Sequence, residues 1–214
     1  MINKPARIAA VVLLCVVLGA CAEATPPAAT AAATEPIHIV ASYESAISQP
    51  VTRLLHDEST VAVVLATIER EEPGRWATPG NVRPDPAQAV NYSVFTPFQI
   101  RIERSLRGAV SVSEVVVQGG AVGEDTVEVN YWPPGVEAGS RAILILGPPQ
   151  FQGLDGTMWV MDSLPVENGQ VFIPERWTTE LVTGAKRSGQ VVTRAGKQQG
   201  TWVAEAAMEA LASR

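Results

Sequence analysis

Few residues in this chain of 214 could carry acid–base or nucleophilic chemistry. It has two histidines, His38 and His56. Asp57 and Ser59 follow His56, so the residue types of a serine hydrolase lie within four positions. Such close neighbours rarely reach the geometry of a catalytic triad, and no nucleophile-elbow glycines surround Ser59. We therefore predict no catalytic residue and keep as an alternative an exported hydrolase that uses His56 or an acidic pair.

Two groups of carboxylates could carry other chemistry, either acid–base catalysis or the binding of a cation. Glu69, Glu71 and Glu72 could supply the acidic pair of a glycosidase, although the sequence does not give the separation between their carboxyl groups. Glu124 and Asp125 follow a glycine and could ligate a hard cation, but calcium needs several more oxygen ligands. We interpret both groups as solvated acidic segments, and we predict no metal site and no cofactor.

Three aromatic residues are candidates for binding. Trp76 lies in the segment 72–88, which is rich in proline, glycine and charge, and Tyr131 and Trp132 lie at a proline-rich turn. Exposed aromatic side chains on loops are typical of carbohydrate or protein recognition. We predict a binding patch at Trp76, Tyr131 and Trp132. The segment 72–88 is also the candidate loop for a second alternative, an exported protease inhibitor.

The first twenty residues have the composition of an export signal. Lys4 and Arg7 precede an apolar run from Ile8 to Leu18. That run is shorter than the roughly 20 apolar residues that span a bilayer, and small residues follow it. The run ends in the sequence Leu18-Gly19-Ala20-Cys21.

This segment resembles the signal peptide and lipobox of bacterial lipoproteins. The resemblance implies cleavage between Ala20 and Cys21, a diacylglyceryl thioether on Cys21 and acylation of the new amine. Each buried methylene contributes about 0.8 kcal/mol, so several chains would hold the protein on a membrane. In a bacterium with two membranes, Ala22 after the cysteine favours the outer membrane. We therefore expect an extracytoplasmic, lipid-anchored protein whose membrane partner is reached through the lipid.

The remaining chain divides into a tether and one domain. Residues 21–36 are almost entirely Ala, Thr and Pro, a composition typical of an extended spacer, and the domain is predicted over 37–214. Cys15 would leave with the signal peptide (1–20) and Cys21 would be lipidated, so the domain has no thiol for a disulfide.

The charge of the chain narrows the possible partners. Cleavage removes two of the 16 basic residues and leaves 14 against 22 acidic residues. This acidic balance argues against nucleic acid as a partner, whereas an envelope protein or a glycan remains possible.

Hydrophobic patterning predicts a β-rich domain. A short helix is predicted over 50–57 and a final helix over 202–212, with Thr201 as its N-cap. The long segment 91–105 alternates between apolar and polar residues, and Asn168-Gly169 is typical of a tight hairpin. Further strands are predicted around residues 61–66, 115–117, 127–129, 142–146 and 158–161.

Many short strands without βα alternation indicate a mainly β fold, a small antiparallel barrel or a sandwich, with a short N-terminal helix and a C-terminal helix. The order of the segments 60–68, 98–108, 115–120 and 139–146 resembles a class of poorly characterised secreted bacterial β-barrel domains, which are similar in layout to oligonucleotide/oligosaccharide-binding (OB) barrels. The resemblance spans about residues 51–174 and implies no substrate. The sequence thus predicts a lipid-anchored envelope protein with a non-catalytic binding or structural interaction domain.

Overall fold

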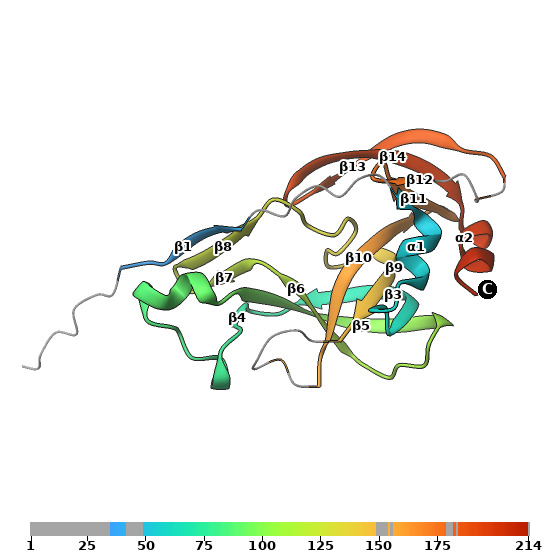
Figure 1. The fold of residues 1–214 in the computed structure, drawn as a ribbon. Helices are drawn as coiled ribbons and strands as arrows, with labels where there is room; N and C mark the ends of the chain where they lie inside the picture. Colours follow the sequence, from blue (N-terminus) through green and yellow to red (C-terminus); the bar gives the residue numbers. More distant parts are fainter. Residues whose placement is uncertain are drawn as a thin grey trace, which may run out of the picture. The chain divides into compact units, whose positions relative to one another are not determined.

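Five strands close into a barrel in the computed structural model, which describes residues 35–41, 49–148, 154, 156–178, 182 and 184–213 (Figure 1). The described residues belong to one compact unit, Glu35–Arg214. The expected signal peptide, Cys21 and nearly all of the expected tether lie outside them. The barrel strands are β3 (Ala62–Glu71), β5 (Val94–Arg107), β6 (Glu114–Gln118), β9 (Arg141–Gly147) and β10 (Met158–Glu167).

The strand order confirms the predicted small barrel. β3 pairs with β5, β5 with β6, β6 with β10, β10 with β9, and β9 with β3 again, which closes the circuit. All of these pairs are antiparallel except β6 and β10, which run parallel. An OB barrel likewise wraps five strands in a Greek-key order.

Two apolar clusters explain the unbroken apolar runs at residues 62–66 of β3 and 142–146 of β9. Side chains from all five strands, such as Val64, Phe98 and Leu144, form the cluster inside the barrel. Their neighbours Leu65 and Ile143 point the other way, into a second cluster between the barrel and the helices. Because both faces of β3 and β9 are buried along these runs, continuous apolar sequence replaces the alternation seen at residues 98–103 of β5.

The second cluster is covered by two helices and a sheet extension. The helices α1 (Val51–His56) and α2 (Glu205–Ala212) lie side by side (Figure 1). β10 continues through a tight turn at Asn168-Gly169, both with positive φ as predicted, into β11 (Gln170–Pro174). β11 pairs with β14 (Gly196–Ala204), and β14 pairs with the outermost strand, β13 (Arg187–Thr193).

The C-terminal helix begins later than predicted. Trp202 and Val203 belong to β14, where they pair with Phe172 and Val171 of β11. Ala204 is the N-cap of α2, so the prediction of Thr201 in that position is wrong. Pairing with a strand some 30 residues earlier outweighs the local helical pattern, as tertiary contacts often do.

A small second sheet lies beside the barrel and contains the first described strand. β1 (His38–Ala41) pairs in parallel with β8 (Asp125–Val129), and β8 pairs with β7 (Gly120–Val122) (Figure 1). A two-stranded pairing joins β2 (Gln49–Pro50) to β12 (Trp177–Thr178). The predicted loop 72–88 contains β4 (Arg75–Trp76), the 3-10 turn Pro79–Asn81 and the start of a second turn, Pro86–Asn91. None of the helices in the described ranges is long and apolar enough to cross a membrane.

The chain leaves the barrel for the small sheet at Gly119-Gly120, the glycine pair that the sequence analysis placed at the end of a strand. Gly120 has φ of 121°, and a Cβ atom there would lie 2.1 Å from Oγ1 of Thr96. We expect Gly120→Ala to lower the free energy of unfolding by about 1–3 kcal/mol, because the buried threonine cannot move aside. Gly123→Ala is the control, since Gly123 also has positive φ but nothing lies within 4 Å of its Cβ position. Equal losses for both variants in urea unfolding would contradict the steric explanation.

Candidate functional site

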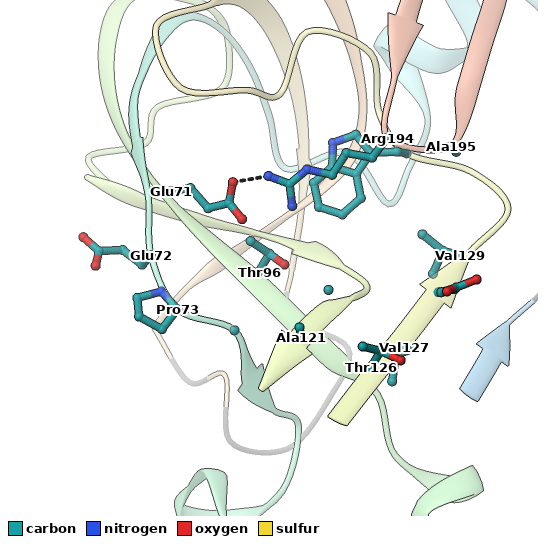
Figure 2. Close-up of a pocket in the computed structure, with 14 residues that line it drawn as sticks. Glu71, Glu72, Pro73, Thr96, Ala121, Thr126, Val127, Val129, Arg194 and Ala195 are labelled. Atoms are coloured by element: carbon teal, nitrogen blue, oxygen red, sulfur yellow. Dashed lines mark hydrogen bonds and ion pairs between the residues drawn. The ribbon is translucent and has the colours of Figure 1, made fainter. Parts of the chain in front are cut away.

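A pocket of about 740 Å³ lies where the barrel, the small sheet and the β13–β14 hairpin meet (Figure 2). Its volume is in the range of pockets that hold small molecules or short peptide segments. It is lined by Glu71, Glu72, Pro73, Gly74, Thr96, Gly120, Ala121, Thr126, Val127, Glu128, Val129, Trp132, Arg194 and Ala195.

Arg194 enters this pocket from the tip of the β13–β14 hairpin. Thr193 and Gly196 are the last paired residues, so Arg194 and Ala195 form the connecting turn. The guanidinium carbon of Arg194 lies 4.5 Å from the centroid of the Trp132 ring, a cation–π contact. The guanidinium also forms an ion pair with Glu71, at the end of β3 (Figure 2).

Trp132 is held in place from the side of the barrel. Its ring packs edge-on against Phe98, with 6.1 Å between centroids, and its Nε1 donates to the carbonyl oxygen of Val136 at 3.3 Å. Gln198, on β14, donates to the Trp132 carbonyl at 3.2 Å. The ring is therefore a fixed surface against which Arg194 rests.

The lining of the pocket is acidic. It contains three carboxylates, Glu71, Glu72 and Glu128, against the single guanidinium of Arg194. Glu72 forms an ion pair with Arg70 at 2.5 Å, and Glu71 is paired with Arg194. Glu128 has no ion pair with any residue in the described part of the chain. A concave surface with an excess of one charge concentrates ligands of the opposite charge.

The floor of the pocket offers little side-chain chemistry of its own. The hydroxyl group of Thr96 is buried and donates to the carbonyl of Gly119 at 2.7 Å. Gly74 and Gly120 have no side chains to place there. Recognition in this pocket therefore depends on the carboxylates and on Trp132.

The expectation that these aromatic residues are exposed is wrong, whereas their role in binding stays a prediction. Trp76 is fully buried, and Trp132 is 3% exposed. Tyr131 is half-buried, and its hydroxyl group donates to Asp162 at 2.6 Å. Trp76 packs with Ile37, Val94 and other residues of a third apolar cluster. Of the three residues, Trp132 lines the pocket. Large aromatic side chains near turns here close the core rather than face solvent.

Tyr131 belongs to a buried charged cluster away from the pocket. Asp162 is 3% exposed and accepts hydrogen bonds from Tyr131, from Nη2 of Arg176 at 2.5 Å and from Nε1 of Trp177 at 2.9 Å. The Arg176 guanidinium also lies over the Tyr131 ring, at 3.6 Å. The cluster joins β10 to the segments that follow β11 and precede β9.

Asp162 and Arg176 form the ion pair of this cluster, and burial shifts the pKa of each group in the direction that favours its neutral form. Burial raises the pKa of Asp162 to about 7, and the N–H groups of Ser163 and Trp177 act against that rise. Burial also lowers the pKa of Arg176 to about 10. The guanidinium at 2.5 Å favours the carboxylate form of Asp162 and so opposes the effect of burial.

The candidate catalytic residues do not assemble into a relay. Ser59 donates to Asp57, but Nε2 of His56 is bonded to the carbonyl of Leu211 at 3.2 Å. No hydrogen bond of the described residues joins His56 to Ser59. His38 lies on exposed β1 and is bonded to Thr126 at 2.8 Å. The geometry thus places the Asp57 carboxylate, and no histidine of the described residues, beside the Ser59 hydroxyl.

The acidic candidates are also distributed among ion pairs. Glu69 lies 3.4 Å from Arg101, and Glu71 and Glu72 reach the pocket with their own arginine partners. Asp125 is not free for a cation, since Arg83 takes both of its carboxylate oxygens, at 2.7 and 2.9 Å. Across the described ranges, no group of three or more His, Cys, Asp or Glu side chains is placed to hold a metal ion.

Asp125 and Arg83 fasten the first described strand to the domain. Asp125 accepts from the backbone N–H of Ile37 at 2.8 Å, and Arg83 donates to the carbonyl of Glu35 at 2.6 Å. Arg83 comes from the loop 72–88, which is thereby held to the small sheet. The role of this loop in protease inhibition stays a prediction.

The Asp125 carboxyl should make stability depend on pH. The Arg83 guanidinium, aided by the Ile37 N–H, lowers the pKa of Asp125 to about 2. The folded protein therefore binds this proton less tightly than the unfolded chain does, and the stabilisation is present above about pH 4 and lost as the pH falls towards 2. We expect Asp125→Asn to lower the urea midpoint at pH 6 and to approach the wild type at pH 2.

Glu124→Gln is the matched control for this titration, because Glu124 is the exposed neighbour on the same turn. It should leave the midpoint unchanged at both pH values. A constant difference between wild type and Asp125→Asn from pH 6 to pH 2 would contradict the assignment.

Local patterns in the sequence indicate the pocket only weakly. The glycine pair at 119–120 and the acidic run at 69–72 were both visible, but the hairpin that delivers Arg194 was not predicted. β13 has polar or small residues on both faces, so it lacks a two-residue period.

No protein-family model, curated protein or solved structure matches the chain.

Proposed function

We propose that the protein is a lipid-anchored protein of the bacterial cell envelope whose Glu35–Arg214 unit is a non-catalytic binding domain for a positively charged ligand. The pocket lining carries the proposal: three glutamates and one arginine line a cavity of about 740 Å³. Such a lining favours a cation, and it disfavours nucleic acid and other polyanions. The proposal of a lipid anchor is based on the resemblance of residues Leu18 to Cys21 to a lipobox.

Binding is tested with two matched peptides and the lipid-anchored protein in a neutral detergent. Calorimetry should give at least about tenfold higher affinity for acetyl-Gly-Lys-Gly-amide than for acetyl-Gly-Glu-Gly-amide, a difference that falls with added salt. Glu128→Gln should weaken binding of the lysine peptide, because Glu128 is the carboxylate without an ion-pair partner in the described structure.

Glu124→Gln removes the same charge from the same sheet without touching the pocket, and it should bind the lysine peptide as the wild type does. Equal affinity for both peptides, or equal losses in both glutamate variants, would sink the proposed binding function.

The anchor has its own experiment. Growth with an alkyne-tagged fatty acid should label the wild-type protein, and Cys21→Ser should be unlabelled and leave the membrane fraction. Mass spectrometry of the N-terminal peptide should show cleavage before Cys21 and acyl chains on it. A bare Cys21 peptide from native membranes would remove the anchor from the proposal and leave the binding experiment unaffected.

A further inference from the structure

The position of Arg194 indicates which cation the pocket recognises. Its guanidinium rests on the Trp132 ring at 4.5 Å and pairs with Glu71. A planar guanidinium can stack on an aromatic ring and at the same time donate to a carboxylate. An ammonium group has no flat face with which to do both. The ring and the carboxylate thus already hold a guanidinium, supplied by the chain itself.

Arg194 is only lightly held in this position. Its side chain is 41% exposed and that of Glu71 is 36% exposed, and ion pairs with such access to water add little to stability. Arg194 lies in the turn beyond the last pair of the β13–β14 hairpin, and β13 pairs with β14 alone. Moving this side chain breaks no strand pairing of the barrel.

The surface that Arg194 covers would remain intact without it. Trp132 is fixed by Phe98 and by the carbonyl of Val136, and Glu71 ends a barrel strand. Both would then be open to a ligand in the pocket, whose lining also includes Glu128. The Trp132 ring and the Glu71 carboxylate therefore stay in place on the barrel side of the pocket. The Arg194 guanidinium, on the hairpin side, is the group that a ligand could replace.

We propose that the pocket binds a guanidinium group, from an arginine side chain or a small guanidine, at the place that Arg194 occupies, and that Arg194 is an internal competitor displaced by the ligand. This inference rests on the proposed binding of cations in the same pocket. It makes a prediction opposite to that for an arginine that anchors an anionic ligand: removal of Arg194 tightens binding.

The test compares Arg194→Ala with the wild type in calorimetric titrations with acetyl-Gly-Arg-Gly-amide. If Arg194 occupies the site most of the time, the apparent affinity for the ligand falls in proportion to the fraction of molecules whose site is free. We therefore expect at least about fivefold tighter binding in Arg194→Ala. Lys197→Ala is the matched control: Lys197 is exposed on the same hairpin, carries the same charge and does not line the pocket. It should change the affinity less than twofold.

Further variants separate this inference from the proposed function. Glu71→Gln added to Arg194→Ala should reverse the gain and reduce the preference for arginine over lysine. If lysine and arginine peptides bind the wild type but Arg194→Ala binds no tighter than Lys197→Ala, the competitor is refuted and cation binding stands. If neither peptide binds any variant, both are refuted. Urea unfolding of each variant should match the wild type, which excludes loss of the fold as the cause.

A third titration distinguishes a small guanidine from an arginine side chain as the source of the guanidinium. N-ethylguanidinium alone should bind Arg194→Ala with affinity similar to that of the peptide if the ligand is a small guanidine. The peptide should bind at least about tenfold tighter if the pocket also contacts neighbouring backbone of an arginine-containing segment. An acidic peptide that binds wild type better than Arg194→Ala would overturn the proposal.

Discussion

Asp162→Ala is expected to lower the free energy of unfolding by about 3 kcal/mol, one of the two largest losses from a single change in this domain. The substitution leaves the Arg176 guanidinium, the Tyr131 hydroxyl and the Trp177 indole N–H without their shared acceptor. Breaking a buried ion pair from one side costs about 3–5 kcal/mol. We take the lower end because the Arg176 side chain is 25% exposed and can be partly hydrated.

The measurement is urea unfolding at pH 7, with the double variant Asp162→Leu/Arg176→Met as its partner. Replacing both charges by apolar side chains removes the unpaired group, so the double variant should recover much of the loss. A loss of less than about 1 kcal/mol for Asp162→Ala, or a double variant less stable than both single variants, would contradict the role given to this cluster.

Trp76→Ala is expected to lower the free energy of unfolding by about 3–5 kcal/mol, the usual range for removing a buried tryptophan. Trp76 is fully buried and packs with Ile37, Ala89, Val94 and Val127. The cluster joins the loop 72–88, the barrel and the small sheet, so a cavity there loosens all three. Trp76→Phe should lose less, because the smaller ring still fills part of the volume.

The control for this change is Val90→Ala, since Val90 lies just after this loop, in the 3-10 turn Pro86–Asn91, and is 77% exposed. It should alter stability by less than about 0.5 kcal/mol. If Trp76→Ala instead left stability unchanged and abolished binding of cationic peptides, Trp76 would be a ligand contact and its assignment to the core would be wrong.

The sequence predicted the barrel well because its strands have strong local patterns. The alternation at residues 98–103, the apolar runs of β3 and β9 and the Asn168-Gly169 turn each determine their structure from a few neighbouring residues. The closing pair of β6 and β10 is parallel and joins residues about 40 positions apart, which no local pattern reports. The fold class was therefore predictable, whereas the order of the strands was accessible only through resemblance.

The candidate site was much less predictable, for two physical reasons. Trp76 and Trp132 lie in segments whose composition is typical of loops, but composition does not say which apolar cluster a loop covers. Three charged residues that line the pocket are far apart in the sequence. Glu71 and Glu128 are 57 positions apart, and Glu128 and Arg194 are 66 positions apart. Only long-range pairing brings them together, and β13 and β14 have too little hydrophobic periodicity to indicate it.

The closed circuit of strands has a consequence for the order of events during synthesis. β3 is complete at Glu71, but its partner β9 ends at Gly147, and β10, which joins β9 to β6, ends at Glu167. A chain that emerges N-terminus first can therefore pair β3 with β5 early, but one edge of β3 stays unpaired until β9 is available and one edge of β6 until β10 is available. Folding that waits for such distant partners is slow, and its incomplete intermediates are prone to aggregate. A holding chaperone at the exit of the ribosome would matter more for this protein than its modest size suggests.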